Sequence, residues 1–181
     1  MACDIANGRL EVCKDAIGGI DAIYFINYGI ESSDITYDAT NLDVIASVNG
    51  VASLYKYELK GTNVFTQVVT SSRENGTSFV EQTLSVQLKK QDIATHKNVK
   101  LLSYGRPHIV VRDRNNNFYL AGLHWGMELT TGNVDSGTAM GDLSGYSLSF
   151  AGQEKLLANL IDVSSEADLI SAFDDASIVN S

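Results

Sequence analysis

Basic residues are scarce in this chain. Its 181 residues include 13 lysines and arginines against 22 acids, which gives a formal net charge of −9 at pH 7. A surface that grips nucleic acid needs clustered Lys and Arg to replace the counterions of the phosphates. The composition therefore argues against such a surface, although it is compatible with DNA that passes the protein without adhering to it.

Long apolar runs and cysteines are also few. No stretch reaches the roughly 18 apolar residues of a membrane helix. Asp4 and Glu11 stand near the start of the chain with no apolar core before them, unlike a secretory signal. We therefore expect a protein that is made and kept inside a cell, with no membrane partner. Cys3 and Cys13 are then predicted to be reduced thiols, the alternative being a disulfide in an oxidising compartment.

The motifs of catalysis and of cofactor binding are missing. His96, His108 and His124 are scattered, with no carboxylate or thiol at the spacing of a catalytic triad or a metal site. The glycines at 132, 137, 141 and 145 form neither a P-loop nor a dinucleotide-binding fingerprint. We therefore predict that the chain is not an enzyme, and that it has no catalytic residue, no cofactor and no metal site.

Two local features have a functional alternative. Asp135 and Asp142 flank a glycine-containing loop, where a calcium site is the alternative to solvated turn aspartates. Trp125 follows His124 after an apolar strand, where a sugar-stacking platform is the alternative to a place in the core or in an interface. We favour turn aspartates in the first case and a core or interface tryptophan in the second.

The clearest pattern that is present is a long hairpin over residues 63–88, folded back on a turn at Asn75 and Gly76. In its second arm Val80, Leu84, Val86 and Leu88 alternate with polar residues, which is the period of a half-buried strand. Asn-Gly is a strong hairpin signal because it suits positive φ. Arms of this length exceed what one small sandwich usually needs, so part of the hairpin is a candidate assembly device.

Further strands are predicted along the rest of the chain. The runs at 43–48 and 53–59 indicate a second hairpin about Asn49 and Gly50, and those at 108–113 and 117–123 a third. One helix is expected at 92–103, with Asp92 as its N-cap. Strands are also predicted at 20–28, 35–37, 127–131 and 143–150. The fold class is therefore mainly β, a β-sandwich or barrel with one flanking α-helix and a long hairpin.

The last 21 residues differ in kind, because they carry five acids and no Lys or Arg. Ser165 is placed to cap a short helix in which Leu169, Ile170 and Phe173 share a face. We divide the chain into a domain at 1–160 and an acidic segment at 161–181. The segment is either a loosely held tail, which we favour, or a peptide that docks on a neighbouring subunit.

Four segments carry a resemblance to the tail tube proteins of tailed bacteriophages, particularly phages of Bacteroidetes-type hosts. They are LYKYELKGTNVFTQ, TSSRENGTSFVEQTLSVQLKK, VKLLSYGRPHIVVRDRNNNFYLAGL and GTAMGDLSGYSLSFAGQEK. The likeness covers residues from about 1 to 160 and includes no catalytic signature. It implies a small β-sandwich or barrel with one flanking helix that assembles into hexameric rings, and the rings stack into a hollow tube.

The resemblance also implies a location and partners. The chain would be a virion structural protein of the tail, assembled in the cytoplasm of the host bacterium. Its partners would be further copies of itself and other phage tail proteins, while genomic DNA passes through the tube during ejection without specific binding. In this family the sheets of adjacent subunits join into one inner barrel, and long hairpins reach the next ring.

Candidate site residues follow from placing the hairpin in such a ring. We assign a subunit interface to the hairpin tip, which comprises Arg73, Glu74, Asn75, Gly76 and Thr77. We assign the lumen to the polar side of the second arm, which comprises Glu81, Thr83, Ser85 and Gln87. The alternatives are another virion structural role, such as a head decoration, neck or tail-end subunit, and a carbohydrate-binding or enzymatic β-sandwich with a concave pocket that holds Trp125.

Overall fold

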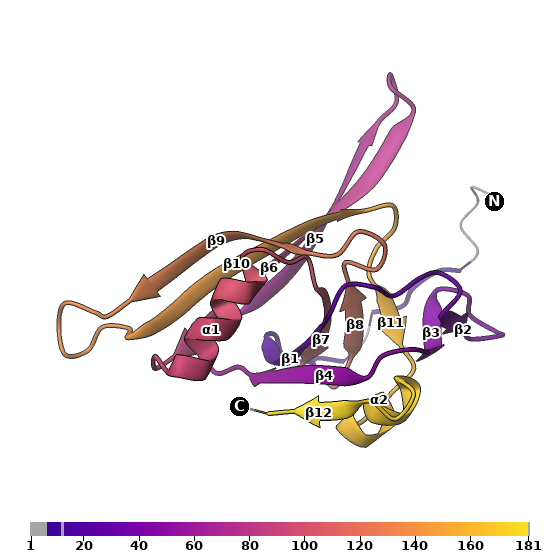
Figure 1. Ribbon diagram of the computed structural model, residues 1–181. Coiled ribbons are helices and arrows are strands. Elements are labelled where there is room, and N and C mark those ends of the chain that lie inside the picture. Colours follow the sequence, from indigo (N-terminus) through magenta and orange to yellow (C-terminus); the bar gives the residue numbers. More distant parts are fainter. Residues whose placement is uncertain (1–6, 12, 181) are drawn as a thin grey trace.

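The computed structural model describes residues 7–11 and 13–180, and these form two β-sheets and two short helices (Figure 1). The mainly β fold class predicted from the sequence is confirmed, including one helix against the sheets and a second, short helix near the C terminus.

The larger sheet has eight strands and contains most of the chain's buried backbone. In spatial order these are β12 (Ser177–Val179), β4 (Ser53–Glu58), β1 (Ile20–Ile26), β7 (His108–Asp113), β8 (Phe118–Ala121), β11 (Asn159–Ile161), β3 (Val44–Val48) and β2 (Ile35–Tyr37). The hairpin predicted at 108–123 is confirmed, because β7 and β8 pair antiparallel. The centre of this sheet is buried on both faces, which explains the unbroken apolar runs of β1 and β7.

The smaller sheet has four long strands. In spatial order these are β5 (Val64–Ser72), β6 (Thr77–Lys89), β10 (Gly145–Glu154) and β9 (Glu128–Asp135). Every neighbouring pair is antiparallel. β9 and β10 both continue several residues beyond the strands predicted from the sequence. The added residues of β9 pair with β10, and those of β10 pair mainly with β6.

The long hairpin of β5 and β6 is confirmed, with pairing from Val64 opposite Ser85 to Ser72 opposite Thr77. Its connection differs from the expected two-residue turn, because residues 73–76 form a four-residue loop. Within this loop only Gly76 has positive φ, at 62°. Asn75 instead donates its backbone N–H to the Ser72 hydroxyl at 3.3 Å. Glycine at position 76 is therefore what the turn requires.

The predicted hairpin about Asn49 and Gly50 is wrong. β3 pairs with β2 and β11, whereas β4 pairs with β1 and β12, so the two strands lie far apart in the same sheet. Gly50 does have positive φ and the chain does turn there. The turn residues specify only that the chain changes direction. The partner of each strand depends on long-range contacts, and both strands find these contacts with strands other than each other.

Two hydrophobic clusters lie on opposite faces of the large sheet. The first fills the space between the two sheets, where Phe25 and Ile109 meet Leu84 and Phe150. The second lies on the other face. There Leu169 and Phe173, near the C terminus, pack with Tyr24, Leu54 and Val110 of the sheet. The small sheet therefore has one face in the core and one face outside it, as the alternating pattern of β6 predicted.

Helix α1 (Ile93–Leu102) closes one end of the space between the sheets. Asp92 caps it as predicted, and its carboxylate accepts the Thr95 N–H at 2.7 Å and the Thr95 hydroxyl at 2.6 Å. These hydrogen bonds lower the pKa of Asp92. Val99 and Leu102 pack on the inter-sheet cluster, so the helix lies against the sheets as expected.

The acidic C-terminal segment packs on its own chain, which neither alternative for it had foreseen. Helix α2 (Glu166–Ala172) begins at the predicted cap Ser165, and Leu169 and Phe173 are fully buried against the large sheet. β12 then pairs in parallel with β4, and β11 crosses the proposed boundary at residue 160.

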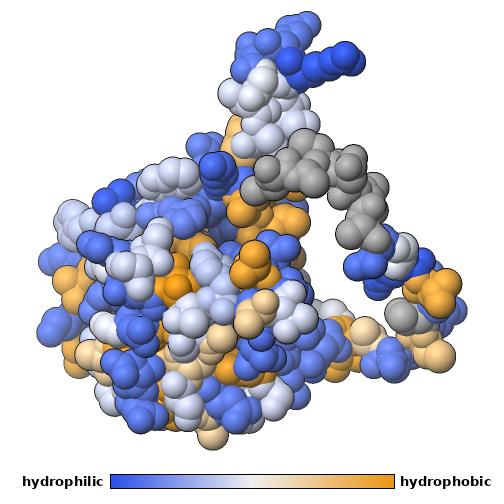
Figure 2. All heavy atoms as spheres, turned by 90° about the vertical axis from the view of Figure 1, so that its right-hand side faces the viewer, coloured by the Kyte–Doolittle hydropathy of each residue, from blue (hydrophilic) through white to orange (hydrophobic). Residues whose placement is uncertain are grey.

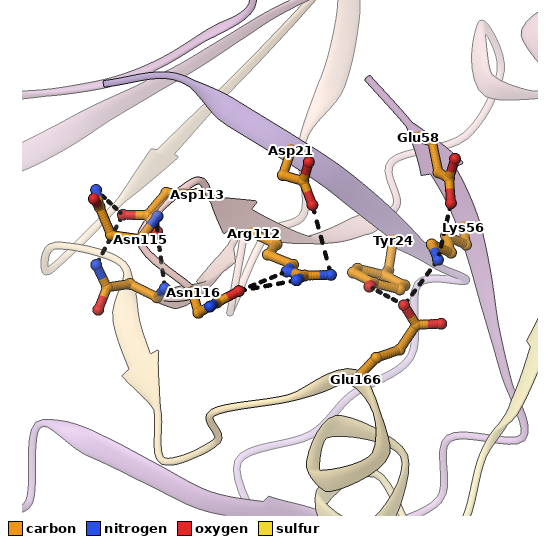
Figure 3. A network of polar contacts seen from close by, with 10 residues as sticks. Asp21, Tyr24, Lys56, Glu58, Arg112, Asp113, Asn115, Asn116 and Glu166 are labelled. Atoms are coloured by element: carbon orange, nitrogen blue, oxygen red, sulfur yellow. Dashed lines mark hydrogen bonds and ion pairs between the residues drawn. The ribbon is translucent and has the colours of Figure 1, made fainter. Parts of the chain in front are cut away.

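A polar network also ties this segment to the large sheet (Figure 3). Glu166 accepts a hydrogen bond from the Tyr24 hydroxyl at 3.2 Å and forms an ion pair with Lys56 at 2.8 Å. Burial and the charge of Glu166 raise the pKa of Tyr24 to about 12. One of the five acids of the segment is therefore a structural contact to β1 and β4.

Candidate assembly surface

The two sheets differ in the length of their edge strands. The outermost strands of the large sheet, β2 and β12, have three residues each. The outermost strands of the small sheet, β5 and β9, have nine and eight. An edge strand presents a row of unpaired backbone N–H and C=O groups, and monomeric proteins usually keep such edges short. Within the described residues, the small sheet is therefore the one with edges suited to pairing with another chain.

The edge strand β5 also lacks the devices that normally prevent pairing. Its sequence, VFTQVVTSS, contains no charged residue and no proline. Val64, Val68 and Val69 are all exposed, and Val68 keeps 52% of its surface accessible. A long, neutral edge with exposed valines is a site of aggregation unless another strand covers it.

The two free edges run in opposite directions. β5 is antiparallel to β6, β6 to β10, and β10 to β9, so three reversals separate the outer strands. The β9 edge of one copy is therefore oriented to pair antiparallel with the β5 edge of the next. The same contact repeated around an axis is a heterologous interface, which closes into a ring if the rotation permits.

The outer face of the small sheet is polar. The four residues assigned to a lumen, Glu81, Thr83, Ser85 and Gln87, lie on this face because Leu84 and Val86 between them point into the core. Their partners across β10 are Gln153, Ala151, Ser149 and Ser147. The structure thus brings the four residues together on one mostly uncharged face, which they share with the exposed Val64 and Val68 of β5. Their place in a lumen stays a prediction.

The tip of the hairpin projects beyond the rest of the molecule (Figure 1). β10 ends at Glu154 opposite Val80, so residues 70–79 of the two arms pair only with each other. The five tip residues assigned to an interface, 73–77, are all exposed. Figure 2 shows this part as a largely hydrophilic projection above the body of the protein. The contact of the tip with a neighbour stays a prediction.

A groove of about 680 Å³ lies where β10 continues beyond the start of β9. Phe79 and Glu81 of β6, Glu128 of β9 and Gln153 of β10 line it, together with Trp125 from the loop that joins β8 to β9. The Trp125 side chain is 54% exposed. The expectation of a core position is therefore wrong, and an interface position for this tryptophan stays a prediction.

Glu154 is the unusual residue of this groove. Its side chain is 2% exposed, and its Oε1 accepts the backbone N–H of His124 at 2.9 Å and of Trp125 at 3.0 Å. Within the described part of the chain its Oε2 has no hydrogen-bond partner, although the atom is buried. Glu154 is therefore a buried acid that joins the end of β10 to the loop before β9.

Sequence reasoning missed Glu154 as a site residue. It follows an alternating strand and carries no motif, so only its buried position in the fold distinguishes it from a surface glutamate. The loop that it holds is also tightly packed, because Gly126 has φ of 75° and a side chain there would collide with the Arg106 carbonyl. Glu154 thus positions Trp125 at the rim of the groove.

The three histidines have different surroundings in the fold. His108 is fully buried, and its Nδ1 lies 2.6 Å from the Gly122 carbonyl while its Nε2 accepts the backbone N–H of Gly29 at 3.2 Å. Burial lowers the pKa of this histidine, so the ring is neutral, and its two nitrogens join the loops at Gly29 and Gly122. His96 and His124 lie near Tyr146 and Trp125, respectively, with no carboxylate joining them.

Of the two aspartates considered for a calcium site, Asp135 ends strand β9 and Asp142 holds the loop that follows. Asp142 accepts the backbone N–H groups of Thr138 at 2.9 Å and Ala139 at 2.7 Å, which lowers its pKa. No group of three or more His, Cys, Asp or Glu residues suited to a metal ion occurs among residues 7–11 and 13–180. Cys13 is exposed, and Cys3 lies outside the described residues.

Comparisons with protein-family models, with curated proteins and with solved structures found no match for this chain. No helix in the described part of the chain is long and apolar enough to span a membrane. The small sheet, its hairpin and the adjoining groove are therefore the features of this chain that bear on its function.

Proposed function

We propose that this chain is a structural subunit that joins further copies of itself edge to edge into closed rings. The rings stack into a tube of the kind that forms the tail tube of tailed bacteriophages. The observation that carries the proposal is the small sheet, which has two long, unprotected edges of opposite direction. Pairing β9 of each copy with β5 of the next removes every one of these edges when the ring closes.

Such a ring contains one continuous β-barrel. Each subunit contributes four strands, so the hexamer implied by the resemblance has 6 × 4, or 24, strands. A barrel with that many strands is wide enough to leave an aqueous channel. One orientation of the subunit is favoured in such a ring, because the large sheet and α1 cover the apolar face of the small sheet. In this proposal the bulk of every subunit lies outside the barrel, and the polar face lines the channel.

The chemistry of that face suits a conduit. Hydroxyl and amide groups dominate it, with Glu81 as the acid at its centre on β6. A duplex of phosphates meets no cluster of Lys or Arg there, and the net charge of −9 repels it weakly. DNA would therefore pass through without binding. In this proposal the tube belongs to a virion tail, is assembled in the cytoplasm of the bacterial host and contacts other tail proteins at its two ends.

Electron microscopy of the purified chain over a concentration series, together with size-exclusion chromatography, tests the proposal. We expect rings or hollow tubes of constant bore. Val68→Lys, on the free β5 edge, should abolish them because a lysine on an edge strand opposes pairing. Val179→Lys is the matched control, since Val179 is a similarly exposed valine on β12, an edge of the large sheet. Rings that survive Val68→Lys but not Val179→Lys would contradict the proposal, and rings that never stack would favour another virion role.

A further inference from the structure

We propose that the groove beside Trp125 receives the projecting half of the β5–β6 hairpin of the adjacent copy in the ring. This inference rests on the edge-to-edge assembly proposed above, and adds the partner surface and the residues that recognise each other. The occupant is a second copy of this chain, and the contact is between neighbours in one ring.

The strand register places the groove in line with the hairpin. β9 begins at Glu128, opposite Ala151, whereas β10 continues to Glu154. The edge of β10 is therefore open from Gly152 onward, and the groove occupies this open stretch. β5 lies on the opposite edge of the same sheet. Its residue Val69 is level with Val80 and Glu154, so the strand continues three residues beyond the end of β10, to Ser72.

A rotated copy brings these two features together. Antiparallel pairing along β9 sets the first residues of the neighbouring β5 beside β9 itself. The remaining residues of that strand, about 67–72, then pass Glu128 and continue alongside the open edge of β10. The hairpin that projects without contacts in one copy thus covers the groove that lies open in the next.

The chemistry of the groove fits that occupant. Glu81, Glu128 and Glu154 line it, with Arg106 and Lys155 on the same wall. The incoming strand is neutral, so it can enter without burying a charge. Arg73 follows it directly and is exposed at the tip, beside Glu74.

A guanidinium can stack on the face of Trp125 and donate to a carboxylate at the same time. Arg73 is exposed at the tip, and Trp125 is half exposed at the rim of the groove, so this stacking contact is open to an incoming hairpin. Arg106 and Lys155, which also line the groove, are the basic residues that Glu74 of the same tip would meet. Both charges of the tip have a counterpart in the groove, which a flat polar sheet alone does not provide.

Trp125 makes the inference measurable, because it is the single tryptophan of the chain. We would hold wild-type protein at a trace concentration and titrate it with Trp125→Phe protein, which offers the hairpin but emits no tryptophan fluorescence. As copies associate, we expect the emission of the trace protein to shift to shorter wavelength. Quenching by acrylamide should fall, because the half-exposed indole becomes covered.

Two titrants separate the groove from the strand edge. Trp125→Phe with Arg73→Glu should need roughly tenfold more protein for the same shift, since the stacking of the guanidinium on Trp125 is lost and a repulsion from the groove glutamates is added. Trp125→Phe with Lys97→Glu carries the same change of charge on an exposed position of α1 and should titrate like the parent. Sedimentation of the same samples reports association independently of the indole.

Each result has a distinct meaning. Association with an unchanged indole signal would overturn the inference and leave the proposed ring intact. Equal titration by the Arg73→Glu and Lys97→Glu proteins would overturn the role of Arg73. Absence of any association at all concentrations, with no rings in the microscope, would overturn the ring and the inference together. An indole shift produced by oligosaccharides and not by the titrant would assign the groove to a sugar instead.

Discussion

Phe173→Ala tests whether the acidic C-terminal segment is a structural part of the domain. Phe173 is fully buried in the cluster between α2 and the large sheet, together with Leu169 and Phe118. Truncating a buried phenylalanine typically costs about 3–5 kcal/mol, which combines lost transfer energy with the cavity left behind. The free energy of unfolding of an ordinary domain is about 5–15 kcal/mol. We therefore expect the substitution to remove a large fraction of the stability of this protein.

Urea unfolding followed by far-ultraviolet circular dichroism measures this cost. Val179→Ala is the control, since Val179 lies on β12 in the same segment but is well exposed. Surface substitutions of that kind usually change stability by no more than about 0.5 kcal/mol. If Phe173→Ala fell within the same range, the segment would be a loosely held tail and the packing described here would be wrong. Equal costs for both substitutions would contradict the argument as well.

Three further predictions concern a histidine, a glycine and the hairpin tip. Because burial lowers the pKa of His108 below its ordinary value, the unfolded chain binds more protons just below pH 6.5, so stability should fall on acidification from pH 7.5 to 5.5. In His108→Gln that part of the loss should vanish in unfolding experiments, whereas the exposed His96→Gln should keep the wild-type slope. Gly126→Ala should destabilise the protein by about 1 kcal/mol or more and change Trp125 emission, because φ is positive and the Arg106 carbonyl blocks a side chain; Gly141→Ala, in open space, should do neither. Replacing Asn75 and Gly76 with two valines should injure assembly more than folding. The strain of valine at the positive φ of Gly76 should lower the unfolding midpoint only modestly, whereas ring formation in electron micrographs should fall strongly; normal tubes would contradict an interface at the tip.

Much of the local structure could be predicted because its causes lie within a few residues. The alternation of Leu84, Val86 and Leu88 with polar residues specifies a strand with one buried face, and the register confirms it. Asp92 and Ser165 cap their helices because a short acceptor side chain there satisfies a free backbone N–H. These features need no knowledge of the rest of the chain.

The choice of partners could not be predicted in the same way. β3 and β4 have the pattern and the turn of a hairpin, yet each pairs with strands that are remote in the sequence. The acidic segment has the composition of a polar tail, but its apolar residues Leu169 and Phe173 pack on one face of the large sheet. In both cases the deciding energy is burial against distant residues, which no local pattern encodes.

The candidate site divides along the same line. The polar stripe on β6, the long hairpin and a tip with Arg73 and Glu74 could be predicted from the sequence, because strand period and turn chemistry are local properties. The sequence did not indicate that β5 and β9 are the free edges, that β10 continues past β9, or that Glu154 is buried beside the Trp125 backbone. Edges and grooves exist only after every strand has its partner, so they are properties of the completed fold.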